Sequence, residues 1–126
     1  CGTPLSRLVR LLPPNPDNRP LSMSYAEALL KTGDAKTAER VLVSQSKLHP
    51  DDPQVWYALA ETHGLAGNIV DVHRARAEYF ILNGALDRAE RQLGYALDLA
   101  DGNFHTSASV QARIADIQEM RQEIDL

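Results

Sequence analysis

The sequence has a single cysteine, Cys1, among its 126 residues. One thiol cannot form an internal disulfide, so cysteine usage leaves the redox compartment open. Aromatic residues are also few, at 6%, and no apolar run approaches the ~20 residues that a membrane-spanning helix needs. The sequence therefore excludes a disulfide-stapled domain and a transmembrane segment.

An excess of positive charge is missing as well. The 13 Lys and Arg residues are scattered among 17 Asp and Glu residues, and the formal net charge is -4. Nucleic-acid binding needs a clustered basic face, so we expect no nucleic-acid partner. What is present, 44% apolar and 24% charged residues, is typical of one soluble domain.

The N-terminus has no basic segment followed by an apolar segment, so the sequence shows no secretory signal. Cys1-Gly2 leaves two interpretations open. It is either the mature start of a bacterial lipoprotein, anchored through Cys1, or an artificial cut through a longer protein. The register of the repeats described below favours the cut, because Cys1 falls in the middle of a unit.

Catalytic motifs are absent too. No G-x-S-x-G or C-x-x-C element offers a nucleophile beside a base. The acidic pairs Asp51-Asp52 and Asp98/Asp101 fall at expected helix ends, where carboxylates stabilise the helix dipole. We predict no catalytic residue in this chain.

The histidines were tested as metal ligands. His63 and His73 fall on adjacent expected helices, but no Cys, Asp or second His stands four residues further on to complete a site. A packing or surface role is favoured over ligation. We expect no metal site and no cofactor in this chain.

What the sequence does contain is a repeat. Residues 15–18 (Asn-Pro-Asp-Asn) recur as 49–52 (His-Pro-Asp-Asp), and Gly33-Asp34 recurs as Gly67-Asn68, both at an offset of 34. The segment Trp56-x-x-Leu59-Ala60, followed by Gly67, opens the second unit. This period, with Gly between paired helices and Pro after the second, resembles the tetratricopeptide repeat (TPR) family.

A second echo has a different spacing. Gly33-x-x-x-x-Ala38-Glu39-Arg40 returns as Gly84-x-x-x-x-Ala89-Glu90-Arg91 at an offset of 51, which is one and a half repeats. The segment 69–82 is therefore predicted to be the second helix of one unit and the first helix of the next.

The fold predicted from these patterns is all-α, a right-handed solenoid of antiparallel helix pairs with a C-terminal capping helix. Asp34, Asp52 and Asn68 are predicted N-caps, and Asn83-Gly84 a helix C-terminus. The expected helices are 3–12, 21–32, 35–48, 54–66, 69–82, 86–99 and 107–123. The expected units are 1–18, the second helix of a truncated repeat; 19–52 and 53–83, two repeats; 69–102, an overlapping third; and 106–124, the cap.

A solenoid of helix pairs has a concave surface lined by the first helix of each unit. Its acidic residues would favour a basic or amide-rich partner; the alternative is a merely solvated face. In the family's known carboxylate clamp, Asn stands where this chain has Glu27 and Glu61, so a carboxylate ligand would be repelled there. By repeat position, the predicted lining residues are Met23, Ser24, Glu27, Tyr57, Ala58, Glu61, Arg74 and Glu78.

The segment 51–124 carries a closer resemblance, covering about 60% of the chain. It is similar to the C-terminal repeat region of bacterial periplasmic zinc metalloproteases of the BepA type, which assist or police outer-membrane β-barrel assembly. The matching features are Trp56-x-x-Leu59-Ala60-Glu61, the half-repeat helix at 74–79 ahead of Asn83-Gly84, and Gln111-Ala112-Arg113-Ile114.

This resemblance implies a periplasmic docking module that brings substrate or the β-barrel assembly machinery to a protease. In that family zinc is held by an HExxH helix in an upstream domain, so no catalytic or metal residue carries over. The competing interpretation is a non-enzymatic adaptor, for instance a lipoprotein or secretion-system assembly factor. Neither the partner's identity nor the oligomeric state follows from the sequence.

Overall fold

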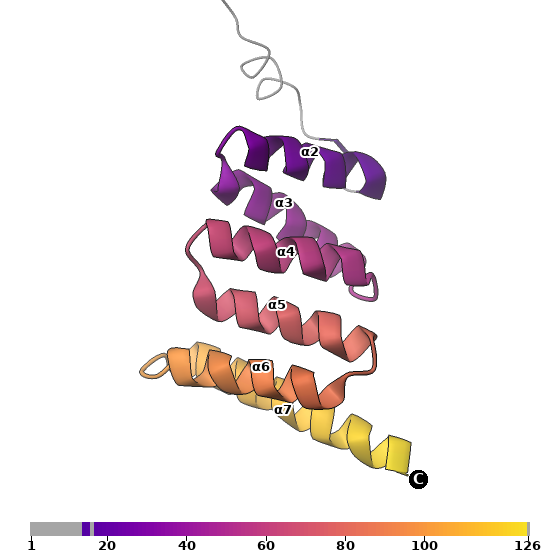
Figure 1. Cartoon of the computed structure of the whole chain (residues 1–126), viewed down its shortest axis with the longest axis vertical. Coiled ribbons are helices and arrows are strands. Elements are labelled where there is room, and N and C mark those ends of the chain that lie inside the picture. Colours follow the sequence, from indigo (N-terminus) through magenta and orange to yellow (C-terminus); the bar gives the residue numbers. More distant parts are fainter. Residues whose placement is uncertain (1–13, 16, 126) are drawn as a thin grey trace, which may run out of the picture.

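The computed structural model describes residues 14–15 and 17–125, and this part of the chain forms antiparallel helices and no strand. The helices are α2 (Arg19–Lys31), α3 (Ala35–Leu48), α4 (Pro53–Leu65), α5 (Ile69–Leu82), α6 (Leu86–Leu99) and α7 (Phe104–Asp125). Helix α3 runs behind α2 and α4, and α7 runs behind α6 (Figure 1). The predicted all-helical, TPR-like solenoid is confirmed.

Local chemistry sets where these helices begin. Asp34 Oδ1 accepts from the Thr37 amide at 3.1 Å, and Asp52 Oδ1 accepts from the Gln54 amide at 3.0 Å. Both are the N-caps predicted from the sequence. The expected spans 35–48, 69–82 and 86–99 are also those observed, whereas the expected helix 3–12 lies outside the described residues.

One predicted helix start is wrong by three residues, and one predicted N-cap is confirmed in position but makes a different contact. Helix α7 begins at Phe104 rather than 107, because Asn103 Oδ1 accepts from the Thr106 amide at 3.1 Å and caps it earlier. Asn68 does occupy the N-cap position of α5, but its side chain makes no capping hydrogen bond there. Its amide donates instead to Glu39 Oε2 on α3, at 2.5 Å.

Glycine shapes the turns within each helix pair. Gly33 between α2 and α3 has φ of 85°, and Gly67 between α4 and α5 has φ of 86°. Residues with a side chain rarely adopt this left-handed conformation. The 34-residue echo of Gly in the sequence therefore reflects the same backbone turn used twice.

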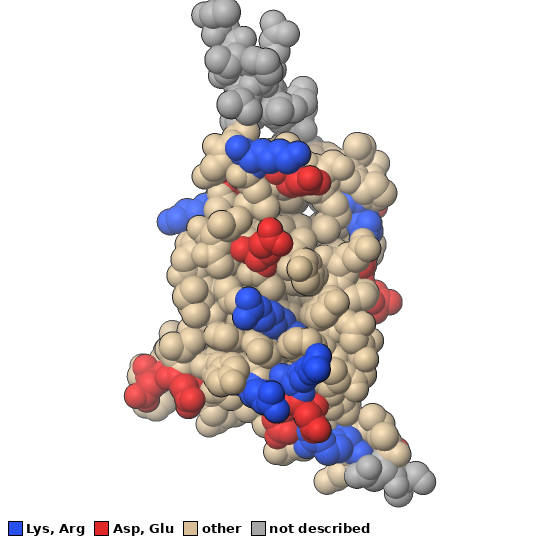
Figure 2. Space-filling model, viewed as in Figure 1, with Lys and Arg blue, Asp and Glu red and all other residues tan. Residues whose placement is uncertain are grey.

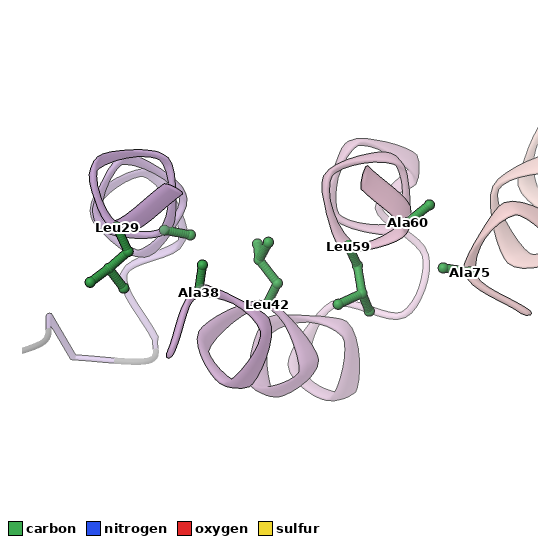
Figure 3. Close-up of a cluster of buried hydrophobic side chains, with 7 residues drawn as sticks. Leu29, Ala38, Leu42, Leu59, Ala60 and Ala75 are labelled. Carbon is green, nitrogen blue, oxygen red and sulfur yellow. The ribbon is translucent and has the colours of Figure 1, made fainter. Parts of the chain in front are cut away.

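Small and large apolar side chains alternate in the core. The first cluster contains Ala26, Leu29, Ala38, Leu42, Leu59, Ala60 and Ala75. In Figure 3, Ala38 and Leu42 of α3 point between α2 and α4, toward Leu29 and Leu59. Alanines where helices meet allow the backbones to approach closely, and leucines fill the remaining space.

Helix α5 belongs to two core clusters. Ala75 joins the first cluster, while Ala77 joins a second one with Ala89, Leu93, Ala96, Val110 and Ile117. Residues two apart lie about 200° apart around a helix, so these two alanines face opposite ways. Helix α5 therefore packs on both of its neighbours, and its sharing by two repeat units stays a prediction.

Polar contacts between alternate helices repeat at similar spacing. Arg19 on α2 pairs with Asp52 and donates to Gln54 Oε1 on α4 at 2.8 Å, 35 residues away. Arg113 on α7 binds Glu78 on α5 through both carboxylate oxygens, at 2.7 and 2.8 Å, also 35 residues apart. Side-chain polar contacts therefore link α7 to α5 in the same way as they link α4 to α2. The unit boundaries themselves stay a prediction.

Candidate functional site

One groove lies between α2 and α4, with α3 contributing to its floor. We call it the α2–α4 groove; it has a volume of about 300 Å³ and is lined by Met23, Ala26, Glu27, Leu30, Leu42, Ala58 and Glu61. Its five uncharged lining residues are apolar, and its two charged ones are glutamates. The groove thus offers an apolar surface beside two negative charges.

The two glutamates of this groove are both exposed. Glu27 lies 3.6 Å from Lys31 one turn along α2, a contact that exposure makes weak. Glu61 forms no ion pair with any residue that the structure describes. Both carboxylates are therefore available to a cationic group entering the groove.

A smaller hollow adjoins the groove at Glu61. It has a volume of about 180 Å³ and is lined by Tyr57, Ala60, Glu61, Arg76 and Tyr79. The rings of Tyr57 and Tyr79 have centroids 5.6 Å apart and planes at 58°, a favourable tilted arrangement. Tyr57 is 60% exposed, so it offers amphipathic contact area to a partner.

Charge on this molecule is dispersed. Figure 2 shows one face, on which blue and red side chains are interspersed with uncharged surface over the whole stack. Several of the blue side chains lie near one another over the lower half of the stack in this view, next to red ones.

A second groove lies between α3 and α5, and we call it the α3–α5 groove. Its volume is about 410 Å³, and its lining residues are Val43, Ser46, Lys47, Trp56, Leu59, His63, Asp71, Arg74, Ala75 and Glu78. On α4, at about 100° per residue, Trp56, Leu59 and His63 face away from the side that Ala58 and Glu61 occupy. The two grooves therefore lie on opposite sides of α4.

The eight predicted lining residues are divided between these surfaces. Met23, Glu27, Ala58 and Glu61 line the α2–α4 groove, Tyr57 lines the adjoining hollow, and Ser24 is exposed on α2. Arg74 and Glu78 instead line the α3–α5 groove. They stand at first-helix positions by sequence, but α5 borders the same groove as α3, so those positions face the other side of α4.

Glu78 differs from the prediction in its chemistry. It was expected to attract a basic partner, but Arg113 holds both of its carboxylate oxygens. Hydrogen bonding to Glu78 raises the pKa of the Arg113 guanidinium above its ordinary value, against the opposing effect of burial. Glu78 is thus committed to fastening α7 onto α5.

The histidines take packing roles, as the sequence favoured. His63 is 8% exposed, and its Nδ1 lies 2.5 Å from Glu39 Oε2. His73 Nδ1 lies 2.7 Å from Gln92 Oε1, and its ring packs on Tyr95 with centroids 5.4 Å apart. Within residues 14–15 and 17–125, no three His, Cys, Asp or Glu residues are grouped so as to hold a metal ion.

The Glu39–His63–Asn68 cluster was missed by sequence reasoning. Glu39 on α3 receives the His63 contact from α4 and the Asn68 amide from the start of α5. Burial alone would raise the pKa of Glu39, but the hydrogen bonds from Asn68 and His63 outweigh it and lower that pKa. The separations of 24 and 29 residues match no local pattern that could have signalled the cluster.

No helix within the described part of the chain has the length and apolar character needed to cross a bilayer.

Residues 5–62 match the family model for the tetratricopeptide repeat. The match spans the helix pair α2 and α3 and most of α4, which supply the α2–α4 groove. This part of the chain is thus similar to a tetratricopeptide repeat, and the antiparallel helices that it forms are those expected of such a repeat.

Proposed function

We propose that this chain is a docking module whose α2–α4 groove holds an extended segment of a partner protein, with an apolar side chain next to a basic one. Tetratricopeptide repeats generally mediate protein–protein interaction and are typically non-enzymatic, which supports the class of function. The single observation that carries the groove assignment is its lining, an apolar surface between the exposed Glu27 and Glu61.

The chemistry of that lining favours a basic segment. A partner lysine or arginine would contact Glu27 or Glu61, while Met23 adapts its flexible side chain to the neighbouring apolar residue. Tyr57 extends the contact area beyond Glu61. A carboxylate would instead be repelled by Glu61, which has no ion-pair partner among the described residues, and by Glu27, whose contact with Lys31 is exposed and weak.

The parent protein belongs to the same proposal. The likeness of segment 51–124 to periplasmic BepA-type metalloproteases supports a role as the docking domain that brings unfolded outer-membrane proteins, or their assembly machinery, to a zinc protease. Zinc would then belong to that protease domain and not to this chain. The alternative is a non-enzymatic adaptor or lipoprotein assembly factor.

Peptide binding tests the groove. A fluorescein-labelled peptide of alternating Lys and Leu should bind the chain, as measured by fluorescence anisotropy, and an unlabelled Glu-Leu peptide should not compete with it for the α2–α4 groove. Replacing Glu27 and Glu61 together by Arg should weaken binding about tenfold or more, since each lost charge contact at a partly desolvated groove costs about 1 kcal/mol.

Glu119→Arg is the matched control, because Glu119 is exposed on α7 and lines neither groove. It should bind the Lys-Leu peptide like the unmodified chain. Equal affinity of the Glu27/Glu61 double variant and the unmodified chain would refute the groove assignment.

The parent is tested by sequencing the reading frame upstream of Cys1. An HExxH helix preceded by a signal peptide would support the protease. A signal sequence ending immediately before Cys1 would sink that interpretation and favour the lipoprotein adaptor.

A further inference from the structure

We propose that the α3–α5 groove is a second docking site, and that its occupant is an acidic peptide segment bearing an apolar side chain. The proposal goes beyond the basic segment assigned to the α2–α4 groove. The two grooves share α4 but use opposite sides of it, so one partner segment does not exclude the other.

The groove has an apolar floor with one large aromatic ring. Val43, Leu59 and Ala75 come from three different helices and line the groove together with Trp56. The half-buried indole ring donates its Nε1 hydrogen to the Pro50 carbonyl at 2.8 Å, which fixes its orientation. A ring held in this way offers a preorganised surface for an apolar side chain.

Free positive charge lies at the edges of this floor. Lys47 on α3 is exposed and forms no ion pair with any residue that the structure describes. Arg74 on α5 donates to Ser109 at 2.9 Å and lies 3.5 Å from Asp71. A guanidinium has five N–H donors, so Arg74 keeps donors for an incoming carboxylate.

The negative charges of the groove are already compensated. Glu78 is held by Arg113 through two hydrogen bonds, and Asp71 faces Arg74. His63, at the groove wall, directs Nδ1 to Glu39. The uncompensated charge is therefore the ammonium group of Lys47, which favours an anionic occupant.

The two sides of α4 thus differ in the sign of their available charge. Glu61, which has no ion-pair partner among the described residues, borders one groove, and Lys47, which likewise has none, borders the other. Charge complementarity selects a basic segment on the first side and an acidic segment on the second.

Trp56 provides an intrinsic reporter for the test. It is the sole tryptophan of the chain, and it lines the α3–α5 groove but not the α2–α4 groove. A peptide of alternating Glu and Leu, free of aromatic residues, should change Trp56 emission saturably when titrated into the 126-residue chain. A Lys-Leu peptide of the same length should leave it unchanged.

Variants assign the effect to the groove. Lys47→Glu should weaken the binding of the Glu-Leu peptide about tenfold, and Lys47→Gln should weaken it by a smaller factor. Circular dichroism should show that both variants fold, because Lys47 is exposed and forms no ion pair within residues 14–15 and 17–125. Arg91→Glu makes the same change of charge at an exposed position on α6 and should not alter the binding of the Glu-Leu peptide.

Three results would overturn the proposal: no change in Trp56 emission, equal effects of Arg91→Glu and Lys47→Glu, or preference for the Lys-Leu peptide at this reporter. The Glu27/Glu61 double variant separates the two sites. This variant should no longer bind the Lys-Leu peptide, but the Glu-Leu peptide should still change its Trp56 emission. The two docking proposals can therefore be refuted independently.

Discussion

Glu39 on α3 links three helices through its carboxylate. Its Oε2 contacts the buried His63 of α4 and accepts a hydrogen bond from Asn68, the N-cap residue of α5. Three helices are therefore joined at one side chain that is 17% exposed. Protonation of Glu39 would weaken contacts with two other helices. Protonation of the exposed Glu27 would remove only a weak surface ion pair with Lys31.

Acid should weaken this junction. Burial acts to raise the pKa of Glu39, but hydrogen bonds from Asn68 and His63 outweigh it, so the folded-state pKa lies below that of the unfolded chain. A depressed pKa stabilises the folded state above the unfolded pKa and loses that contribution as pH falls through the folded value. Glu39→Gln should therefore lose less unfolding free energy than the unmodified chain between pH 5 and pH 3.

Urea denaturation at pH 7, 5 and 3 measures this difference. Glu61→Gln serves as the control, because Glu61 is exposed and unpaired within the described residues, and it should keep the pH dependence of the unmodified chain. An identical pH profile for Glu39→Gln and the unmodified chain would show that the junction does not contribute.

At the scale of the elements, the helix ends that depend on one neighbouring side chain were predictable. Asp34 and Asp52 were identified because an N-cap and its helix are adjacent in sequence. The start of α7 was missed because the Asn103 cap stands without the repeat pattern that marked the others. Asn68 was assigned the right position but the wrong contact, since its partner lies 29 residues away.

The candidate site divides in the same way. Four of the seven lining residues of the α2–α4 groove follow from the repeat positions of two consecutive first helices. Arg74 and Glu78 do not, because the side that a shared helix presents depends on how it packs against both neighbours. The Glu78–Arg113 pair spans 35 residues, and no local pattern specifies it.

Turn glycines give a prediction at this scale. Gly67→Ala should destabilise the chain by about 1–2 kcal/mol, because φ of 86° is strained for a residue with a side chain. No atom lies within 4 Å of the added Cβ, so the cost is conformational and not steric. Thermal unfolding followed by circular dichroism measures it.

Gly94→Ala is the matched control with the opposite sign. Gly94 lies inside α6, and its added Cβ would also meet open space. Alanine should raise stability there by about 0.5–1 kcal/mol, because it is the better helix former. Equal effects of the two substitutions would contradict the conformational explanation.

At the scale of the whole molecule, the stack is quasi-one-dimensional, and each helix packs mainly on the next. Long surfaces on both sides of the layer follow from this arrangement. Helix α4 is their common wall, with Ala58 and Glu61 on one side and Trp56 and His63 on the other. The proposed docking of a basic segment requires only the first of these two sides.

An NMR titration tests this central claim most directly. A ¹⁵N-labelled chain titrated with the Lys-Leu peptide should show its largest amide shift changes around Met23, Glu27, Ala58 and Glu61, the lining of the α2–α4 groove. Amides near Lys47 and Arg74 should change little. Largest changes confined to α6, α7 or the turns, with the groove amides unmoved, would contradict the account.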